Sequence, residues 1–242
     1  MKRVILITLY LFISSVSIWS DEGKTLLAQQ YYNNENYQEA QKIYEQLLLI
    51  NPASSELNYN LANTYYHQNK LGKAKYYYKS SLKSHPRDAD THHNLKILNL
   101  KLIDTINEPM SLGALFKRMI SSFTSSELLI VISILLIILN GAVFIWLKLN
   151  KDYAKGVTLI VSFAIVITSI SLSVKQNISI QTGIIITEKV AIKSGPLKSF
   201  DTLFYLHDGT EFAVLNTNEY WTKIKLSNGL VGWAHNSSYW SH

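Results

Sequence analysis

The sequence of 242 residues contains no cysteine. This excludes disulfide bonds, a thiolate nucleophile and any zinc or iron–sulfur site held by cysteine. It also lacks a Gly-x-Ser-x-Gly motif, a glycine-rich phosphate loop and a His-Glu-x-x-His motif. His92 and His93 are adjacent, and neighbouring side chains on a helix point about 100° apart, so they cannot easily share one metal ion. We therefore expect no enzyme activity, no metal and no cofactor.

The net charge of +6 is not gathered into one basic stripe. Lys2 and Arg3 begin the chain, and Lys148, Lys151 and Lys155 lie together in one short connector. Basic residues beside apolar segments orient a chain in a membrane. We interpret much of the excess as such topology charge, and we expect no nucleic-acid partner.

The apolar residues are concentrated in three blocks, Val4–Trp19, Leu128–Leu147 and Val157–Val174. The first follows a basic start and ends before the small residue Ser20, which is typical of a secretory signal peptide over residues 1–20. An uncleaved anchor helix is the alternative, and both would export the segment that follows. The layout indicates a membrane protein with two water-exposed domains.

The second and third blocks predict transmembrane helices over residues 128–147 and 157–174. Twenty helical residues span roughly 30 Å, which matches the hydrocarbon core of a bilayer. The connector, residues 148–156, carries three lysines, and short basic loops stay in the cytoplasm. The two helices therefore form a hairpin with both flanking domains on the far side. We expect a bacterial inner-membrane protein with these domains in the periplasm.

Residues 105–127 form the linker before the first predicted span. Its apolar residues recur at helical spacing, with Lys117 and Arg118 on another face. The pattern favours an amphipathic helix on the outer leaflet. An ordinary linker helix packed on the preceding domain is the alternative.

The polar segment after the signal peptide repeats with a period of 34 residues. The repeated positions pair Leu27, Ala28, Tyr31, Ala40, Tyr44 and Pro52 with Leu61, Ala62, Tyr65, Ala74, Tyr78 and Pro86. Small alanines let two antiparallel helices approach closely, tyrosines fill the space between them, and proline ends the second helix. The pattern resembles the tetratricopeptide repeat (TPR) and predicts an all-α TPR solenoid over residues 21–104.

Two repeats and a third helix at about residues 89–103 make up this predicted array. Lys96 replaces the expected small residue in the third helix, which favours a capping helix with a polar outer face. By repeat position, a concave protein-binding face is lined by Thr25, Gln29, Tyr32, Asn33, Tyr59, Asn63, Tyr66 and His67. A solvated polar face without a ligand is the alternative. Lysines at 70, 73, 75, 79 and 83 are interpreted as a solvated outer face.

From Ile184 onward the sequence changes to short β-strand patterns separated by turn signals. Asn228-Gly229 between apolar residues is a strong two-residue hairpin signal. The motifs Val190-Ala-Ile-Lys-Ser-Gly-Pro196, Leu206-His-Asp-Gly209, Trp221-Thr-Lys-Ile224 and Gly229-Leu-Val-Gly-Trp233 resemble bacterial SH3-like domains. We expect a small all-β SH3-like barrel over residues 183–242.

Alternation along the Trp221 strand places Ile224 on the buried side and Trp221 on the opposite side. Trp221 and Tyr220 would then form an exposed aromatic pair that binds a peptide or a cell-wall glycan. The alternative is that Trp221 shields the rim of the barrel.

The order of signal, TPR pair, membrane hairpin and SH3-like domain resembles the BatE proteins, the TPR proteins of the Bacteroides aerotolerance (Bat) operon. The resemblance covers nearly the whole mature chain and is most specific in Thr187–Gly209. It implies von Willebrand A-type membrane proteins as partners, with a cytoplasmic MoxR-type ATPase, and a role in aerotolerance or envelope stress. The sequence thus favours a membrane-anchored scaffold. The alternative is an envelope receptor that binds peptidoglycan or a peptide through its last domain.

Overall fold

The structure is a computed structural model that describes residues 22–104, 112–149, 152–177 and 181–241. The chain divides into two compact units, one made of Met1–Ile106 with Gly183–His242 and the other of Asn107–Thr182. The predicted signal peptide and residues 105–111 of the linker lie outside the described residues. The parts before and after the two long apolar helices therefore belong to one unit.

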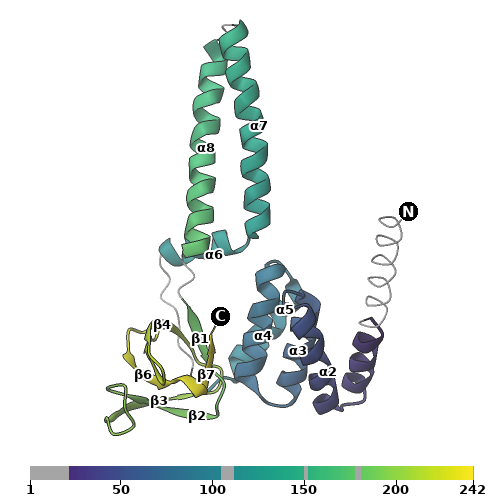
Figure 1. Cartoon of the computed structure of the whole chain (residues 1–242), viewed down its shortest axis with the longest axis vertical. Helices are drawn as coiled ribbons and strands as arrows, with labels where there is room; N and C mark the ends of the chain where they lie inside the picture. The colour runs from purple at the N-terminus through teal and green to yellow at the C-terminus, as the bar shows by residue number, and fades with distance from the viewer. Residues whose placement is uncertain (1–21, 105–111, 150–151, 178–180, 242) are drawn as a thin grey trace, which may run out of the picture. The chain divides into compact units, whose positions relative to one another are not determined.

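Five described helices build the N-terminal part of the first unit (Figure 1). They are a helix over residues 22–33, α2 (Tyr37–Ile50), α3 (Ser55–His67), α4 (Leu71–Ser84) and α5 (Ala89–Lys101). The side chains of Ser54 and Asp88 accept hydrogen bonds from the backbone N–H groups of Leu57 and Thr91 and so cap α3 and α5. We call these five helices the array.

The period of 34 residues recurs in the backbone and the core of the array. Glu35 and Asn69 occupy the same repeat position, between the two helices of each pair, and both have left-handed φ, 58° and 59°. The repeated core residues are almost completely buried: Ala28, Ala62, Ala40, Ala74, Tyr44 and Tyr78. The predicted packing of small residues with tyrosines is confirmed.

The C-terminal part of the first unit is a sheet of seven strands in the order β3-β2-β6-β5-β4-β1-β7. The strands are β1 (Thr182–Ile185), β2 (Lys189–Lys193), β3 (Thr202–His207), β4 (Glu211–Thr217), β5 (Trp221–Lys225), β6 (Val231–His235) and β7 (Tyr239–Ser241). All strand pairs with an assigned register are antiparallel. The predicted closed barrel is wrong: in the described chain the sheet ends at two edge strands, β3 and β7.

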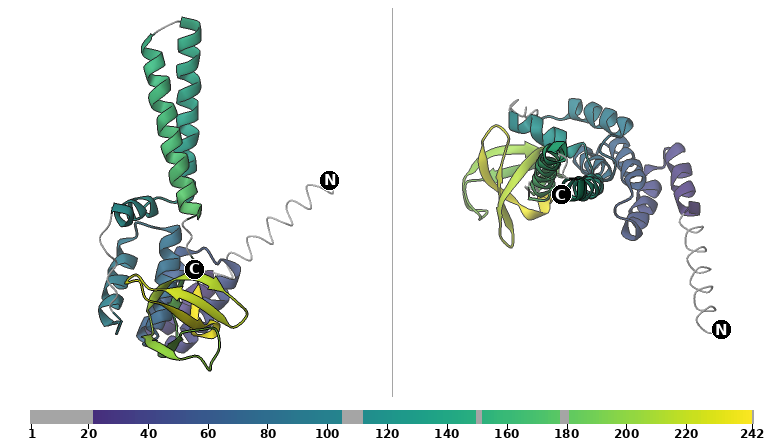
Figure 2. Two further views of the ribbon diagram at one scale, coloured as in Figure 1. Left: turned by 90° about the vertical axis from the view of Figure 1, so that its left-hand side faces the viewer. Right: turned by 90° about the horizontal axis from the view of Figure 1, so that it is seen from above.

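The second unit contains α6 (Leu112–Ser121), α7 (Ser125–Leu149) and α8 (Asp152–Asn177). Figures 1 and 2 show α7 and α8 side by side as a hairpin. Their apolar stretches, Ser125–Lys148 and Tyr153–Lys175, are long and apolar enough to cross a membrane and are mostly exposed to their surroundings. Both helices extend beyond the predicted spans, because helical structure continues into the predicted connector.

Polar side chains within α7 and α8 hydrogen-bond to backbone carbonyls of their own helix. Asn140 donates to the carbonyl of Leu136 at 2.8 Å, and Thr168 donates to that of Ala164 at 2.8 Å. An unpaired polar group in hydrocarbon is strongly unfavourable. This pairing makes both helices compatible with a bilayer.

Candidate protein-binding face

The predicted concave-face residues all lie on the first helix of a repeat, and we call this surface the front face. Its centre is a cluster of aromatic rings. The ring of His67 stacks on Tyr37 with centroids 4.8 Å apart, and Tyr32 and Tyr66 meet it edge-on at 5.5 and 5.8 Å. Residues 34 apart, such as Tyr32 and Tyr66, are therefore joined through His67. The repeat brings these predicted residues together.

Asn94 of α5 joins the front face to the end of the array. Its amide donates to the Tyr59 hydroxyl at 3.0 Å and to Asn63 Oδ1 at 3.1 Å. The buried Tyr78 hydroxyl donates to the same Asn63 oxygen at 2.5 Å. These bonds fix the Asn63 side chain, so this part of the front face is held in one conformation.

Three further predicted residues lie on the helix over residues 22–33. Gln29 and Asn33 are exposed, and Thr25 is half-buried. The amides of Gln29 and Asn33 are therefore accessible to a ligand.

α5 carries a third set of front-face positions, which was not predicted. One period after Tyr59, Asn63, Tyr66 and His67 come His93, Ile97, Leu100 and Lys101. On this front side of α5 two apolar side chains are exposed, Ile97 at 38% and Leu100 at 79%. Lys101 Nζ lies 4.2 Å from the centroid of the Tyr66 ring, a cation–π contact. The 34-residue spacing itself could have identified these positions.

Tyr32 on the front face and Tyr44 behind it are uncharged at neutral pH. Burial, with Tyr32 and Glu56 nearby, raises the pKa of Tyr44 to about 12. Burial, with Tyr37 and Tyr59 nearby, also raises the pKa of Tyr32. Tyr32 therefore presents a neutral ring and hydroxyl group to a ligand.

The opposite surface of α4 differs from its predicted solvated state, and we call it the back face. Lys75 is 8% exposed, and its ammonium group donates to the Gly209 carbonyl at 3.0 Å. Lys79 forms an ion pair with Glu211. Lys73 lies 5.0 Å from the centroid of the Trp240 ring. The back face is thus covered by the C-terminal sheet of the same chain, which corrects the prediction for these three lysines.

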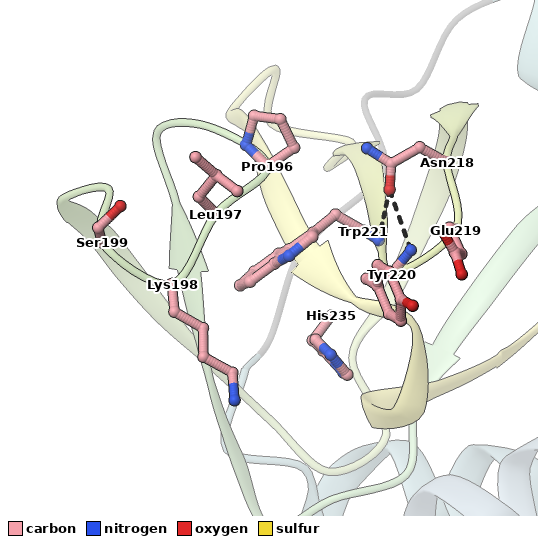
Figure 3. A pocket seen from close by; sticks show the side chains of 9 residues that line it. All are labelled: Pro196, Leu197, Lys198, Ser199, Asn218, Glu219, Tyr220, Trp221 and His235. Carbon is pink, nitrogen blue, oxygen red and sulfur yellow. Dashed lines mark hydrogen bonds between the residues drawn. The ribbon is translucent and has the colours of Figure 1, made fainter.

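The predicted ligand face of the sheet is a pocket of about 760 Å³ (Figure 3). It is lined by Pro196, Leu197, Lys198, Ser199, Asn218, Glu219, Tyr220, Trp221 and His235. Tyr220 is 58% exposed, but Trp221 is only 8% exposed, so the predicted exposed pair is not formed. The loop that carries Pro196 and Leu197 lies beside the indole and shields it, so Trp221 lines the pocket instead of standing free.

The aromatic side of this pocket is held by backbone hydrogen bonds. Asn218 Oδ1 accepts from the N–H groups of Tyr220 and Trp221 at 3.1 and 2.8 Å (Figure 3). Asn236 donates to the Asn218 and Glu219 carbonyls at 2.9 and 3.2 Å. These bonds hold the segment Asn218–Trp221, which forms this side of the pocket, in one conformation.

Comparison with known families identifies the repeat. Residues 31–96 match the tetratricopeptide repeat. The match spans α2, α3 and α4 and most of α5, and includes six of the eight predicted front-face residues. The N-terminal part of the first unit is therefore a TPR array, as the period predicts. No curated protein matches the chain by sequence.

Three solved structures show partial likeness to this chain. The TPR domain of Arabidopsis OM64 is 9% identical, with a TM-score of 0.33 over 59% of this chain and 93% of that one. The Yersinia enterocolitica type III secretion translocator chaperone SycD is 14% identical, with a TM-score of 0.34 over 64% and 93%. A type III secretion complex from Aeromonas hydrophila is 14% identical, with a TM-score of 0.35 over 69% and 90%.

Proposed function

We propose that the protein is a non-enzymatic, membrane-anchored scaffold whose front face binds a segment of a partner protein. One observation supports this most: aromatic, amide and apolar side chains continue across three helices, from Tyr32 through Tyr66 to Leu100. Rigid aromatic rings and adaptable amides are the side chains that protein-binding loops use most. TPR arrays typically act as interaction modules, which agrees with this assignment.

Two apolar helices inserted into one folded unit support a membrane anchor. Two crossings return the chain to the side from which it entered. An even number of crossings is required here, because the residues before and after the hairpin form the same unit and must lie on the same side of the membrane. The basic connector and the predicted signal peptide favour the periplasmic side of a bacterial inner membrane for that unit.

The partner that we propose rests on the resemblance to the BatE proteins. It is a von Willebrand A-type membrane protein within a Bat-type complex, associated with a MoxR-type ATPase and serving aerotolerance or envelope stress. The C-terminal sheet, which resembles an SH3-like domain in its motifs, would bind a second ligand or the same complex.

The experiment compares two exposed leucines in the full-length protein in native membranes. Leu100→Ser changes the front face, and Leu49→Ser changes a leucine on α2 that is 85% exposed and outside the front face. We expect von Willebrand A-type proteins to co-purify with wild type and Leu49→Ser, and their recovery to fall at least about tenfold with Leu100→Ser. Equal recovery with both variants would contradict front-face binding.

A second candidate function is an envelope receptor, favoured by the pocket beside Trp221. A peptide or a peptidoglycan fragment would lie against the indole, between Lys198 and Glu219. Retention of the full-length protein on intact peptidoglycan, with loss of retention in Tyr220→Ala, would support this candidate. No retention of the wild type would rule out peptidoglycan as the ligand of this pocket.

A further inference from the structure

The array is incomplete as a stack of helix pairs. Two pairs are followed by α5 alone, and the described chain up to Asp104 supplies no second helix for it. The last repeat of a solenoid exposes a surface against which the next repeat would pack, so arrays usually end in a cap. Here the back face of α4 and the chain after α5 are the surfaces that need covering.

One turn of the sheet, His207–Thr210 between β3 and β4, covers the start of α4. The N-cap residue of α4, Lys70, makes no side-chain capping bond. The side chain of Asp208 lies at this N-terminus, and its Oδ1 is buried without a hydrogen-bond partner among the described residues. Burial raises the pKa of Asp208, while the backbone N–H groups of Gly72 and Leu71 act in the opposite direction. A carboxyl group of the sheet therefore lies against the free N–H groups at the start of a helix of the array.

Gly72 permits the close approach of the two parts. A Cβ at this position would collide with the carbonyl oxygen of Ile185 and the Asp208 carboxylate, and would lie 2.9 Å from the backbone nitrogen of Gly209. Gly209 in turn has a left-handed φ of 85° and lies against the side chain of Leu102. The backbone of α4 at Gly72 therefore packs directly against the backbone of the sheet at Ile185 and Gly209, and no side chain fits at position 72.

The chain after α5 is fastened to the same turn. Asp104 accepts hydrogen bonds from the backbone N–H of His207 at 2.7 Å and from the Thr210 hydroxyl at 2.6 Å. His207 Nδ1 also lies 3.1 Å from the other Asp104 oxygen. The last described residue before the linker is therefore held by three polar contacts from the sheet.

A second patch joins α4 to the end of the sheet. The Trp240 ring of β7 packs edge-on against Tyr76 and Tyr77, with centroids 5.3 and 5.9 Å apart. Two lysines of α4 flank these tyrosines and contact Glu211 of β4. Lys79 forms an ion pair with Glu211, and the Lys75 ammonium group lies 3.8 Å from its carboxylate. Aromatic and charged contacts therefore lie along the back face, in addition to those of the turn His207–Thr210.

We propose that the C-terminal sheet is the cap of the TPR array, taking the place of a further repeat, so that the array and the sheet fold as one cooperative unit. The interface consists of the back face, Leu102 and Asp104 on one side and His207–Glu211 with Trp240 on the other. This inference does not depend on what the front face binds.

Charge reversal across the interface tests the proposal in the full-length protein in lipid nanodiscs. Lys79→Glu and Glu211→Lys are made singly and together, and hydrogen exchange is followed by mass spectrometry in peptides of α2, α4 and β4. Each single variant is expected to accelerate exchange in both the array and the sheet by about tenfold, and the double variant to restore most of the protection. The exposed ion pair of Lys42 with Glu39 supplies the control, since Lys42→Glu should leave the sheet unchanged.

The proposal fails if acceleration stays within the altered element, or if the double variant is no better protected than the single ones. A pair of cysteines gives an independent result, because the chain has none of its own. Lys79→Cys with Glu211→Cys should be joined within one chain by a short bifunctional thiol reagent, and Lys42→Cys with Glu211→Cys should not. Absence of the first cross-link would overturn docking itself.

Discussion

The two faces of the array carry similar residues but have different roles. Both combine tyrosines with lysines: Tyr32, Tyr66 and Lys101 on the front face, and Tyr76 and Lys73 on the back face. The back face packs against the sheet of the same chain, whereas the front face presents Leu100 and Ile97 to its surroundings. Composition alone therefore does not tell a binding face from an internal interface. What differs is whether another part of the chain covers it.

The largest effect is expected from Gly72→Ala, which places a methyl group between the array and the sheet. Overpacking at this contact destabilises by about 3 kcal/mol, because the nearest atom is the backbone carbonyl oxygen of Ile185, which cannot move aside as the end of a side chain can. Thermal unfolding of the full-length protein measures this change. Gly23→Ala is the control, since a Cβ there would meet nothing within 4 Å. Equal stability of the two variants would contradict the tight interface.

Asp104→Ala is expected to have the next largest effect, with a defined pH dependence. Burial raises the pKa of Asp104, but hydrogen bonds from Thr210 and His207 outweigh it and hold this pKa below its usual value. Such a carboxyl stabilises the fold above its unfolded pKa of about 4, and this contribution is lost as the pH falls through the lower folded value.

We therefore expect Asp104→Ala to lower the free energy of unfolding by about 2 kcal/mol at both neutral pH and about pH 5. The difference from wild type should shrink below about pH 4. Denaturant titrations across this pH range provide the measurement. A difference that is already absent at about pH 5 would contradict the hydrogen-bonded, ionised state of Asp104.

Lys73→Ala should have a smaller effect on the same face. The ammonium group lies over the rings of Trp240 and Tyr65, and such contacts contribute about 0.5–1 kcal/mol. Chemical denaturation can resolve this change when it is compared with Lys42→Ala on the exposed surface of α2. An effect no larger than that of the control would show that Lys73 does not contribute to the second patch.

The smallest effect on stability is expected from Tyr220→Ala in the pocket of the sheet. Tyr220→Ala removes a mostly exposed ring and should change the free energy of unfolding by less than about 0.5 kcal/mol. Trp221→Ala empties a buried site and should lower it by about 3 kcal/mol. Unfolding of both variants tests whether Tyr220 is available for a ligand while Trp221 is structural.

The sequence predicts the front face because its period is local. Residues 34 apart take equivalent positions, so the repeat alone places Tyr32 and Tyr66 on the same surface. The same rule applied once more identifies Leu100 and Lys101, although Lys96 departs from the repeat pattern and favours a polar cap. Helix pairs and their first-helix surfaces are therefore predictable wherever the repeat continues.

The back face was not predictable, because its contacts join distant parts of the chain. Lys75 and Gly209 are 134 residues apart, and no local pattern distinguishes a lysine that will be buried by a sheet from a solvated one. The open edges of the sheet and the burial of Trp221 could not be predicted for the same reason, because both depend on contacts between segments that are separated in the sequence. Alternation along β5 gives two sides but does not reveal that the loop at Pro196 and Leu197 shields one of them.

Site-specific photo-crosslinking in native membranes tests the central contrast most directly. A photoreactive residue is placed at Tyr66 on the front face or at Lys79 on the back face of the full-length protein. We predict that the Tyr66 position yields a cross-link to another protein, and that the Lys79 position yields a cross-link to β4 of the same chain. A partner captured at Lys79, with none captured at Tyr66, would contradict the assignment of the two faces.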